Sequence, residues 1–498
     1  MTQSVLHYIN HQLIKPAGNK HFPVYNPATG EMIKQVISAT TSEIHDVMIA
    51  AKNALISWAQ VTPLKRARVL FNFKMLLDKN INQLAELLTQ EHGKTLEDAK
   101  GEVLRAIELV EFSCGTPYLL QGNYSENVGT SVDTYTIKQP LGVCVGISPF
   151  NFPVMISTWM SIPAIACGNT FILKPSEKNP SVTLLLAQLL QEAGLPHGVF
   201  NVLQGDKETV DALITHPDVA AVSAVGSTPV AKHIYQTAIF HGKRAHTFGG
   251  AKNHCVVMPD ADMNETADAI LGAAFGAAGE RCMATSVVVA VTDSVADHLI
   301  SRLKIKIPQL TIASGMHEKV DMGPLVTQEH LERVKKYVEL GIKEGAALIV
   351  DGREIKNVDH HNGFFMGGCL FDRVTKNMRI YQEEIFGPVL CIVRVNTFEE
   401  AIALINENQY GNGVALFTRE GGIAKTFASK INVGMIGINV SIPVPVAYHT
   451  FGGWKQSVFG DIAMHGAENV HFYTRSKTIT VRWPMEKKES STFDMQSH

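Results

Sequence analysis

The stretch VCVGISPFNFPVMISTWMSIPAIACGNTFILKPSEKNP, residues 143–180, decides the fold that the sequence predicts. Two short apolar runs, VCVGI and TFILK, flank a run of helical length that begins at a Pro-Phe-Asn-Phe-Pro turn. A strand, a helix and a second strand in this order form a β-α-β unit with parallel strands. Polar residues follow both strands, and ligands bind at the carboxyl ends of such strands. The stretch predicts an α/β fold with a ligand site, although a solvated loop carrying a surface ion pair is the alternative.

The same alternation continues along the chain and predicts two sheets. VFNVL, VAAVSAV and a strand before Phe248 extend the first sheet, and CVVMP and SVVVAV begin a second one after residue 255. Upstream, the apolar period predicts helices at Ser42–Ala59, Leu64–Glu91 and from Leu96 to about Tyr118, with Gly93 as a cap between the last two. A further helix is expected to run to Ala278, and another to begin at Asp293.

Two polar, alternating segments do not fit either sheet. Residues Asn127 to Lys138 contain SVDTYTI and predict an exposed hairpin, and HFYTRSKTITVRW near the C-terminus has the same pattern. Exposed strand edges pair readily with another chain. We expect these segments to form an oligomerisation arm, followed by a frayed polar tail at 486–498.

Composition excludes several classes of protein. The 498 residues are 45% hydrophobic and 18% charged, with a net charge of −3, which indicates large cores and gives no electrostatic case for nucleic acid. No run approaches the ~20 apolar residues of a membrane span, and the N-terminus has no signal-peptide layout, so we expect a cytoplasmic protein. The seven cysteines form no C-x-x-C, and no paired Cys/His or H-E-x-x-H spacing predicts a metal site.

Three residues are candidates for chemistry. Cys282 lies in the Gly-rich segment FGAAGERCMATS, and a neighbouring arginine would favour its thiolate, although a lone cysteine is more often a small buried hydrophobe. Asn151, in the Pro-Phe-Asn-Phe-Pro turn, would donate an N–H to a developing oxyanion. Ser227, in AVGSTPVA, suits a phosphate at a helix start, although it is more often an ordinary helix cap.

Five motifs in this order and spacing resemble the aldehyde dehydrogenase superfamily over nearly the whole chain. They are Pro-Phe-Asn-Phe-Pro, Lys-Pro-Ser-Glu, Gly-Ser-Thr-x-Val, Gly-Glu-Arg-Cys and Glu-Glu-Ile-Phe-Gly-Pro at 383–388. The resemblance implies a Rossmann-like NAD domain, an α/β catalytic domain and a small β oligomerisation arm. It places the NAD domain at 1–126 and 140–248 with 448–470 returning to it, the catalytic domain at 249–447, and the arm at 127–139 and 471–485.

The resemblance also implies residue roles. Cys282 would be the nucleophile that forms a thioester, and Asn151 with the Cys282 backbone N–H would hold the oxyanion. Lys174 and Glu177 would bind the adenosine ribose of NAD, where a carboxylate disfavours NADP. The remaining residues expected to bind the cofactor are Ser148 and Phe150 in its channel, Ser227 at the pyrophosphate, Glu384 at the nicotinamide ribose, and Lys178 and Gly249.

The chain departs from most members of the superfamily at the water-activating Glu. Thr247 or Phe248 stands in its place, and no carboxylate occurs between Asp218 and Asp260. Water attack on a thioester would then be about 10²–10⁴-fold slower, whereas a thiol with pKa ~8.5 needs less help. The missing base argues for transfer to coenzyme A, with Glu280 as the competing candidate base. Ala231, where many members have Gly, is a second departure.

Within the superfamily the chain resembles the methylmalonate-semialdehyde dehydrogenases, which acylate coenzyme A. GGAKNH (249–254), GERCMA (279–284) and PVPVAYHTFGGWKQSVFGD (443–461) carry this likeness. Arg105 and Arg281 would clamp a substrate carboxylate, although Arg105 alone fits a solvated helix face equally well. Malonate or methylmalonate semialdehyde would give acetyl- or propionyl-CoA with loss of carbon dioxide, as in valine or myo-inositol degradation, and the enzyme would be a homotetramer.

Two rival functions remain at this point. One is a hydrolytic, NAD-dependent aldehyde dehydrogenase that releases a free acid. The other is a silent member that keeps only the fold or NAD binding, against which the joint presence of Cys282, Asn151 and Glu384 argues.

Overall fold

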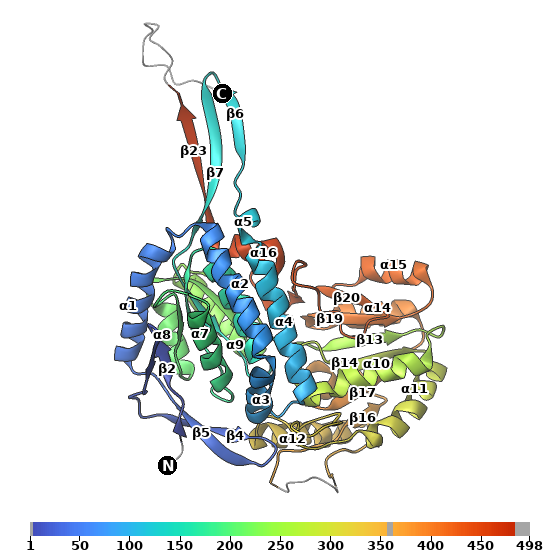
Figure 1. The fold of residues 1–498 in the computed structure, drawn as a ribbon. Coiled ribbons are helices and arrows are strands. Elements are labelled where there is room, and N and C mark those ends of the chain that lie inside the picture. Colours follow the sequence, from blue (N-terminus) through green and yellow to red (C-terminus); the bar gives the residue numbers. More distant parts are fainter. Residues whose placement is uncertain (1–2, 356–361, 484–498) are drawn as a thin grey trace.

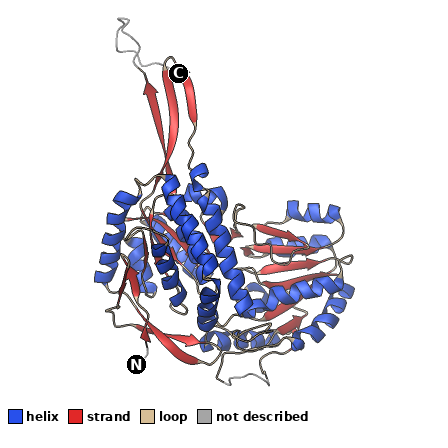
Figure 2. Cartoon of the chain, viewed as in Figure 1, coloured by secondary structure: helices blue, strands red, loops and turns tan. Residues whose placement is uncertain are grey.

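A computed structural model of the chain describes residues 3–355 and 362–483 and contains two large sheets, a projecting arm and surrounding helices (Figures 1 and 2). Within these residues, no helix has both the length and the apolar character needed to cross a membrane. The predicted polar loop around His360 and His361 and the tail at 486–498 lie outside the described residues.

The first sheet has eight strands in the order β22-β12-β11-β8-β9-β10-β2-β3. Its five central strands are parallel, as predicted. These are β8 (Val143–Ile147), β9 (Thr170–Lys174), β10 (Phe200–Val202), β11 (Val219–Val225) and β12 (Arg244–Phe248), flanked by β2 (His7–Ile9), β3 (Gln12–Ile14) and β22 (Val458–Phe459). The helices that follow or cover them are α1 (Thr41–Trp58), α6 (Pro153–Ala166), α7 (Ser181–Glu192), α8 (Lys207–Thr215) and α9 (Thr228–Phe240).

Alternation along these strands separates two hydrophobic cores. In β9, Phe171 and Leu173 pack on one face with α6 and with the helices α2 (Pro63–Lys79), α3 (Ile81–His92) and α4 (Leu96–Cys114). Ile172 packs on the other face with α1, α8 and α9. Successive side chains of a strand point to opposite faces. Both faces of this sheet are therefore covered by helices, which explains its continuous apolar runs.

The second sheet has seven strands in the order β15-β16-β17-β14-β13-β19-β20. Its strands are β13 (Asn253–Val257), β14 (Thr285–Val291), β15 (Ala347–Val350), β16 (Cys369–Asp372), β17 (Val389–Val395), β19 (Gly413–Phe417) and β20 (Met435–Ile438). Its helices are α10 (Met263–Phe275), α11 (Asp293–Lys306), α12 (Gln328–Lys343), α13 (Arg379–Gln382), α14 (Phe398–Glu407) and α15 (Gly421–Lys430). A separate core fills this half of the molecule. The exact domain boundaries stay a prediction.

The predicted long helix at Leu64–Glu91 is two helices, α2 (Pro63–Lys79) and α3 (Ile81–His92). The Asn80 side chain donates to the Leu76 carbonyl at 2.7 Å and so competes with the helical backbone pattern. Gly93 caps α3 with a φ of 95°, as predicted. The next helix, α4 (Leu96–Cys114), also ends earlier than expected and is followed after Gly115 by the single turn α5 (Thr116–Leu119).

The arm consists of β6 (Tyr124–Gly129), β7 (Val132–Pro140) and β23 (Thr474–Arg482) in the order β23-β7-β6 (Figure 1). The predicted hairpin is confirmed, and the C-terminal strand pairs with it antiparallel from Thr474 to Arg482. His471 and Phe472, predicted to begin this strand, end the short helix α16 (Gly466–Phe472) instead. Small sheets at β4 (His21–Asn26), β5 (Glu31–Ile37) and β1 (Gln3–Ser4), and at β18 (Tyr410–Gly411) and β21 (Trp454–Lys455), complete the fold.

One buried side chain ties the base of the arm to the first sheet. Asn169 accepts hydrogen bonds from the N–H groups of Leu141 and Gly142 at 2.7 and 3.0 Å. It also donates to the carbonyls of Ala164 and Tyr473 at 3.0 and 2.9 Å. We expect Asn169→Ala to lower the free energy of unfolding by about 3–5 kcal/mol, because the N–H groups of Leu141 and Gly142 and the Tyr473 carbonyl lose this partner, while the Ala164 carbonyl keeps the bond from the Asn169 backbone N–H.

Urea unfolding followed by fluorescence measures this effect. Asn169→Asp keeps the two acceptor contacts and should lose less stability, and Asn53→Ala, on the exposed face of α1, serves as the control. Equal midpoints for Asn169→Ala and Asn53→Ala would contradict the assignment.

Candidate active site

Cys282 lies on a strained loop that leads into β14. The predicted helix to Ala278 ends at Phe275, because Ala277 and Ala278 have φ values of 49° and 54° and turn the chain sharply. Gly279 continues the turn, and a Cβ there would stand 2.4 Å from the Gly387 carbonyl oxygen. Non-glycine residues with positive φ are uncommon and gather at functional sites.

The peptide of Cys282 is held from the second sheet. Asn253 and Asn412 both donate to the Cys282 carbonyl, at 2.8 and 3.1 Å. All seven cysteines lie within the described residues, and Cys282 alone is half-buried; the other six are buried thiols, as expected for Cys144, Cys167 and Cys391. Burial raises the pKa of each of those six thiols.

Asn151 reaches Cys282 from the first sheet. It follows β8 in the turn before α6, and its Nδ2 lies 3.2 Å from the Cys282 sulfur. Burial raises the pKa of the Cys282 thiol to about 11, while the Asn151 amide opposes this shift. Two residues that are 131 positions apart are thus brought together, one after the carboxyl end of β8 and the other before the amino end of β14, where a thiolate and an amide donor would face one reacting carbonyl.

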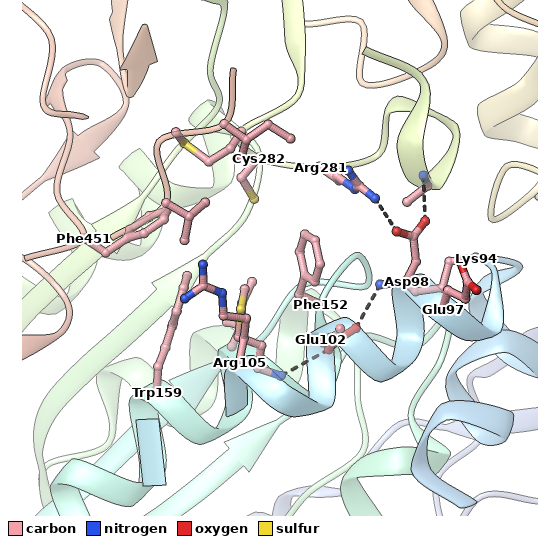
Figure 3. A pocket seen from close by; sticks show the side chains of 17 residues that line it. Lys94, Glu97, Asp98, Glu102, Arg105, Phe152, Trp159, Arg281, Cys282 and Phe451 are labelled. Atoms are coloured by element: carbon pink, nitrogen blue, oxygen red, sulfur yellow. Dashed lines mark hydrogen bonds and ion pairs between the residues drawn. The ribbon is translucent and has the colours of Figure 1, made fainter. Parts of the chain in front are cut away.

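A cavity of about 370 Å³ opens in front of the Cys282 sulfur (Figure 3). Trp159, Phe152 and Phe451 supply aromatic walls, and Lys94, Arg105 and Arg281 supply positive charge. Acidic side chains of α4 line the same cavity. Its size suits a small aldehyde rather than a bulky one.

Both predicted arginines line this cavity, and each is already paired with a carboxylate of α4. Arg281 forms an ion pair with Asp98, toward which its side chain is turned in Figure 3, and Asp98 also accepts from the Ala277 N–H at 3.1 Å. Arg105 lies 2.7 Å from Glu108. Each guanidinium keeps further N–H donors, because arginine carries five.

The residues predicted to bind the adenosine end of a cofactor lie after β9. Lys174 Nζ lies 3.4 Å from Glu177 and 3.0 Å from the Gly205 carbonyl. Burial opposes ionisation of Glu177, but the charges of Lys174 and Lys178 and the hydrogen bonds to the carboxylate together keep the pKa of Glu177 below its usual value. Lys178 lies over the Phe150 ring, 4.5 Å from its centroid.

Of the remaining predicted cofactor residues, Glu384 lines a second hollow at Cys282, whereas Ser227, Ser148 and Gly249 lie outside its lining. Ser227 begins α9 without a capping bond from its side chain, and the buried Ser148 hydroxyl has no partner in the described residues. Glu384 accepts from the Ala251 N–H at 2.8 Å, just after Gly249. Burial raises the pKa of Glu384. Cys282 and Glu384 both line this hollow.

No carboxylate replaces the missing water-activating Glu. Thr247 is buried and donates to the Ala231 carbonyl at 2.9 Å, and Phe248 is buried as well. Ala231, the second departure from the family pattern, is buried, and its carbonyl accepts this hydrogen bond from Thr247.

Glu280, the competing candidate base, turns away from the cavity. Its carboxyl is wholly buried, accepts from the Val326 N–H at 3.3 Å and lies 3.5 Å from His330 and 3.9 Å from His92. Burial raises its pKa to about 8. It lines neither hollow at Cys282, as expected for a residue two positions from the nucleophile.

Sequence reasoning missed Lys94, Asp98 and Glu102 as functional residues. Their pattern on α4 and the preceding loop resembles a solvated helix face. The neighbouring sequence does not distinguish an acidic residue that binds a distant arginine from one that faces water. The buried Glu102 is nevertheless only 2% exposed, and Lys94 1%.

We expect the alkylation rate of Cys282 to rise about tenfold per pH unit between pH 7 and 9.5, because the thiolate is the reactive form and the pKa lies near 11. Asn151→Ala should slow alkylation at every pH, since it removes the N–H that favours the thiolate. Iodoacetamide labelling without cofactor, read by peptide mass spectrometry, measures both rates. A plateau near pH 8 would refute the expectation, and the six buried cysteines serve as internal controls.

Comparison with known proteins shows the family of the chain. The sequence profile of the Aldehyde dehydrogenase family matches residues 13–479. A malonate-semialdehyde dehydrogenase of Pseudomonas aeruginosa is 53% identical over 99% of both chains, and malonate-semialdehyde dehydrogenase 2 of Geobacillus kaustophilus is 46% identical over 97% of this chain and 99% of its own.

Two solved structures extend the likeness to the fold. A methylmalonate-semialdehyde dehydrogenase of Oceanimonas doudoroffii superimposes with a TM-score of 0.96 at 52% identity, covering 98% of this chain and 99% of its own. A Sinorhizobium meliloti protein described by the same activity and complexed with NAD gives 0.97 at 51% identity, covering 98% and 100%. With Cys282 and Asn151 in contact between two α/β sheets, and with matches that span the whole chain, this protein belongs to the aldehyde dehydrogenase family of oxidoreductases.

Proposed function

We propose that the protein oxidises malonate semialdehyde or methylmalonate semialdehyde with NAD and transfers the acyl group to coenzyme A. The observation that carries this proposal is a nucleophile without the family's hydrolytic Glu: Cys282 faces an arginine-lined cavity, and Thr247 or Phe248, both buried, stands in place of that Glu. The names of the most similar relatives support the same substrates.

The first step is attack by the Cys282 thiolate on the aldehyde carbon. A carbon–sulfur bond forms, the carbonyl π electrons move to oxygen, and Asn151 Nδ2 donates to that oxyanion. The pKa of the free thiol is raised by burial, so this step depends on every group that favours the thiolate. When the oxyanion collapses, hydride leaves the same carbon and a Cys282 thioester remains.

Several residues fit an NAD molecule at this site. Ser227 begins α9 with an unused hydroxyl and free N–H groups, as an anion requires, and the Ser148 hydroxyl is buried without a partner. Lys174 and Glu177 would hold the ribose at the end of β9, with Phe150 and Lys178 beside the channel. Glu384 and the backbone at Gly249 would hold the other end. NAD, when bound, accepts the hydride.

Thioester transfer to coenzyme A follows from the missing base. A water molecule needs a general base to attack the thioester, and the candidate base that the sequence offers, Glu280, is turned into a buried cluster with His330 and His92. Coenzyme A carries a thiol that ionises far more readily than water. Its sulfur attacks the acyl carbon, and the Cys282 sulfur leaves as a thiolate.

Arg105 and Arg281 would bind the substrate carboxylate through the N–H groups that Glu108 and Asp98 leave free. The carboxylate of an acyl thioester of this kind is β to the carbonyl. Loss of carbon dioxide breaks the bond to the carboxyl carbon, its electron pair moves into the thioester carbonyl as an enolate, and the enolate then takes a proton. The products are acetyl-CoA or propionyl-CoA.

The biological setting is proposed on the same basis. The reaction fits the degradation of valine or myo-inositol in the cytoplasm. The arm, with its exposed strands β6 and β23, would join subunits into a homotetramer arranged as a dimer of dimers.

Stopped-flow measurement of NADH, with and without coenzyme A, tests the proposal. We expect a burst of about one NADH per Cys282 that turns over continuously only when coenzyme A is present, with release of carbon dioxide. Cys282→Ser serves as the control and should give no burst. Steady turnover without coenzyme A would instead identify a hydrolytic enzyme.

We expect Arg105→Met and Arg281→Met each to lower kcat/KM for malonate semialdehyde by about 10- to 100-fold, because each removes a charge-assisted hydrogen bond to the carboxylate. Propionaldehyde has no carboxylate, so its kcat/KM should change less than about threefold. Arg419→Met, at an exposed arginine of the second sheet's surface, is the matched control. Equal losses with both aldehydes would contradict a role in substrate recognition.

A further inference from the structure

Lys94 and Glu102 form a completely buried ion pair beside the active site. Lys94 Nζ lies 2.9 Å from Glu102 Oε2, and both side chains are 0% exposed. Lys94 stands on the loop between α3 and α4, and Glu102 stands on α4. Replacing such a pair by apolar residues of similar volume is often neutral for stability, so stability by itself does not explain why charges occupy this position.

Both members of the pair bind the turn that carries Asn151. Lys94 Nζ donates to the Asn151 carbonyl at 2.5 Å, and its ammonium lies 4.3 Å from the centroid of the Phe152 ring. Glu102 Oε1 accepts from the Val154 and Met155 N–H groups at 2.7 and 3.1 Å.

These contacts hold the turn at both of its ends. The first N–H groups of a helix have no partner within the helix, and the residue before α6, Phe152, has no side chain that caps them. Glu102 supplies that cap from another helix. Lys94 fixes the carbonyl of the residue whose side chain faces Cys282, and the turn is held between the two charges.

We propose that Lys94 and Glu102 are positioning residues that fix the Asn151 side chain as the hydrogen-bond donor to the Cys282 sulfur and to the oxyanion formed there. The inference deepens the proposed function, on which its catalytic part rests, but the effect on the Cys282 thiol holds for any substrate. Without the pair, the segment from Asn151 to Met155 loses three hydrogen bonds to its backbone and the link to α4.

Charge and position predict opposite results for Glu102→Gln. If only electrostatics mattered, removal of a negative charge would leave Lys94 uncompensated, favour the Cys282 thiolate and speed its alkylation. If Glu102 positions Asn151, the same variant slows alkylation. The amide NH2 that replaces Glu102 Oε2 meets the Lys94 ammonium and displaces it from the Asn151 carbonyl, so the Asn151 N–H that favours the thiolate moves away. We expect alkylation of Cys282 by iodoacetamide at pH 8 to slow by about threefold to tenfold.

A double-mutant cycle with Asn151→Ala identifies the route of the effect. Residues that act through Asn151 lose their influence once its amide is gone, so Glu102→Gln should change alkylation by less than about twofold in that background. The rate constant of the NADH burst should follow the same pattern. A loss of about 10²-fold is expected in the wild-type background, with little further loss when Asn151 is Ala.

Controls separate positioning from misfolding. Lys94→Met combined with Glu102→Gln removes both charges, leaves no unpaired buried ion and should slow alkylation as Glu102→Gln does. Lys100→Met, at an exposed lysine of α4, should leave both rates unchanged. Faster alkylation of Glu102→Gln, or an equal loss with and without Asn151, would overturn the inference. If the wild-type protein gave no NADH burst, the proposed function would be overturned instead. The alkylation rates of the double-mutant cycle would still decide whether Lys94 and Glu102 position Asn151.

Discussion

The hydrogen bond from Asn151 to the Cys282 sulfur crosses the boundary between two separately packed halves of the molecule. Asn151 follows a strand of the eight-stranded sheet, and Cys282 precedes a strand of the seven-stranded sheet, each with its own hydrophobic core. Burial raises the pKa of the thiol, so the reactive thiolate depends in part on the Asn151 amide, which the other half provides. The placement of one sheet against the other is therefore the constraint on which the chemistry depends.

Several of the charged side chains that line the cavity come from one helix, α4. α4 carries Asp98, Glu102 and Arg105, and its acids pair with Arg281 and with the buried Lys94. Pairs of this kind hold long side chains in defined positions before a ligand arrives, which lowers the entropic cost of binding. In the proposed function, the same helix would contribute both to substrate recognition and to the alignment of the reacting atoms.

The contacts of Thr247 and Glu280 bear on whether either residue could act as a general base for water. Thr247 is committed to a carbonyl of α9, and Glu280 is committed to the Val326 N–H and two neighbouring imidazoles. Neither is free to activate water. A thioester formed on Cys282 would persist until a better nucleophile arrives, which connects the packing of two buried side chains to the choice of acyl acceptor.

The sequence by itself determined the alternation of strands and helices, the arm hairpin and the motif residues around Cys282, because apolar period and turn residues are local signals. It misjudged where helices end at Asn80 and Phe275, since a side chain bond to a carbonyl and two positive φ values override periodicity. Only the tertiary structure decided which acid pairs with Arg281 and what holds Asn151. Those partners come from distant segments, and a periodic pattern tells which face a residue occupies but not what packs against it.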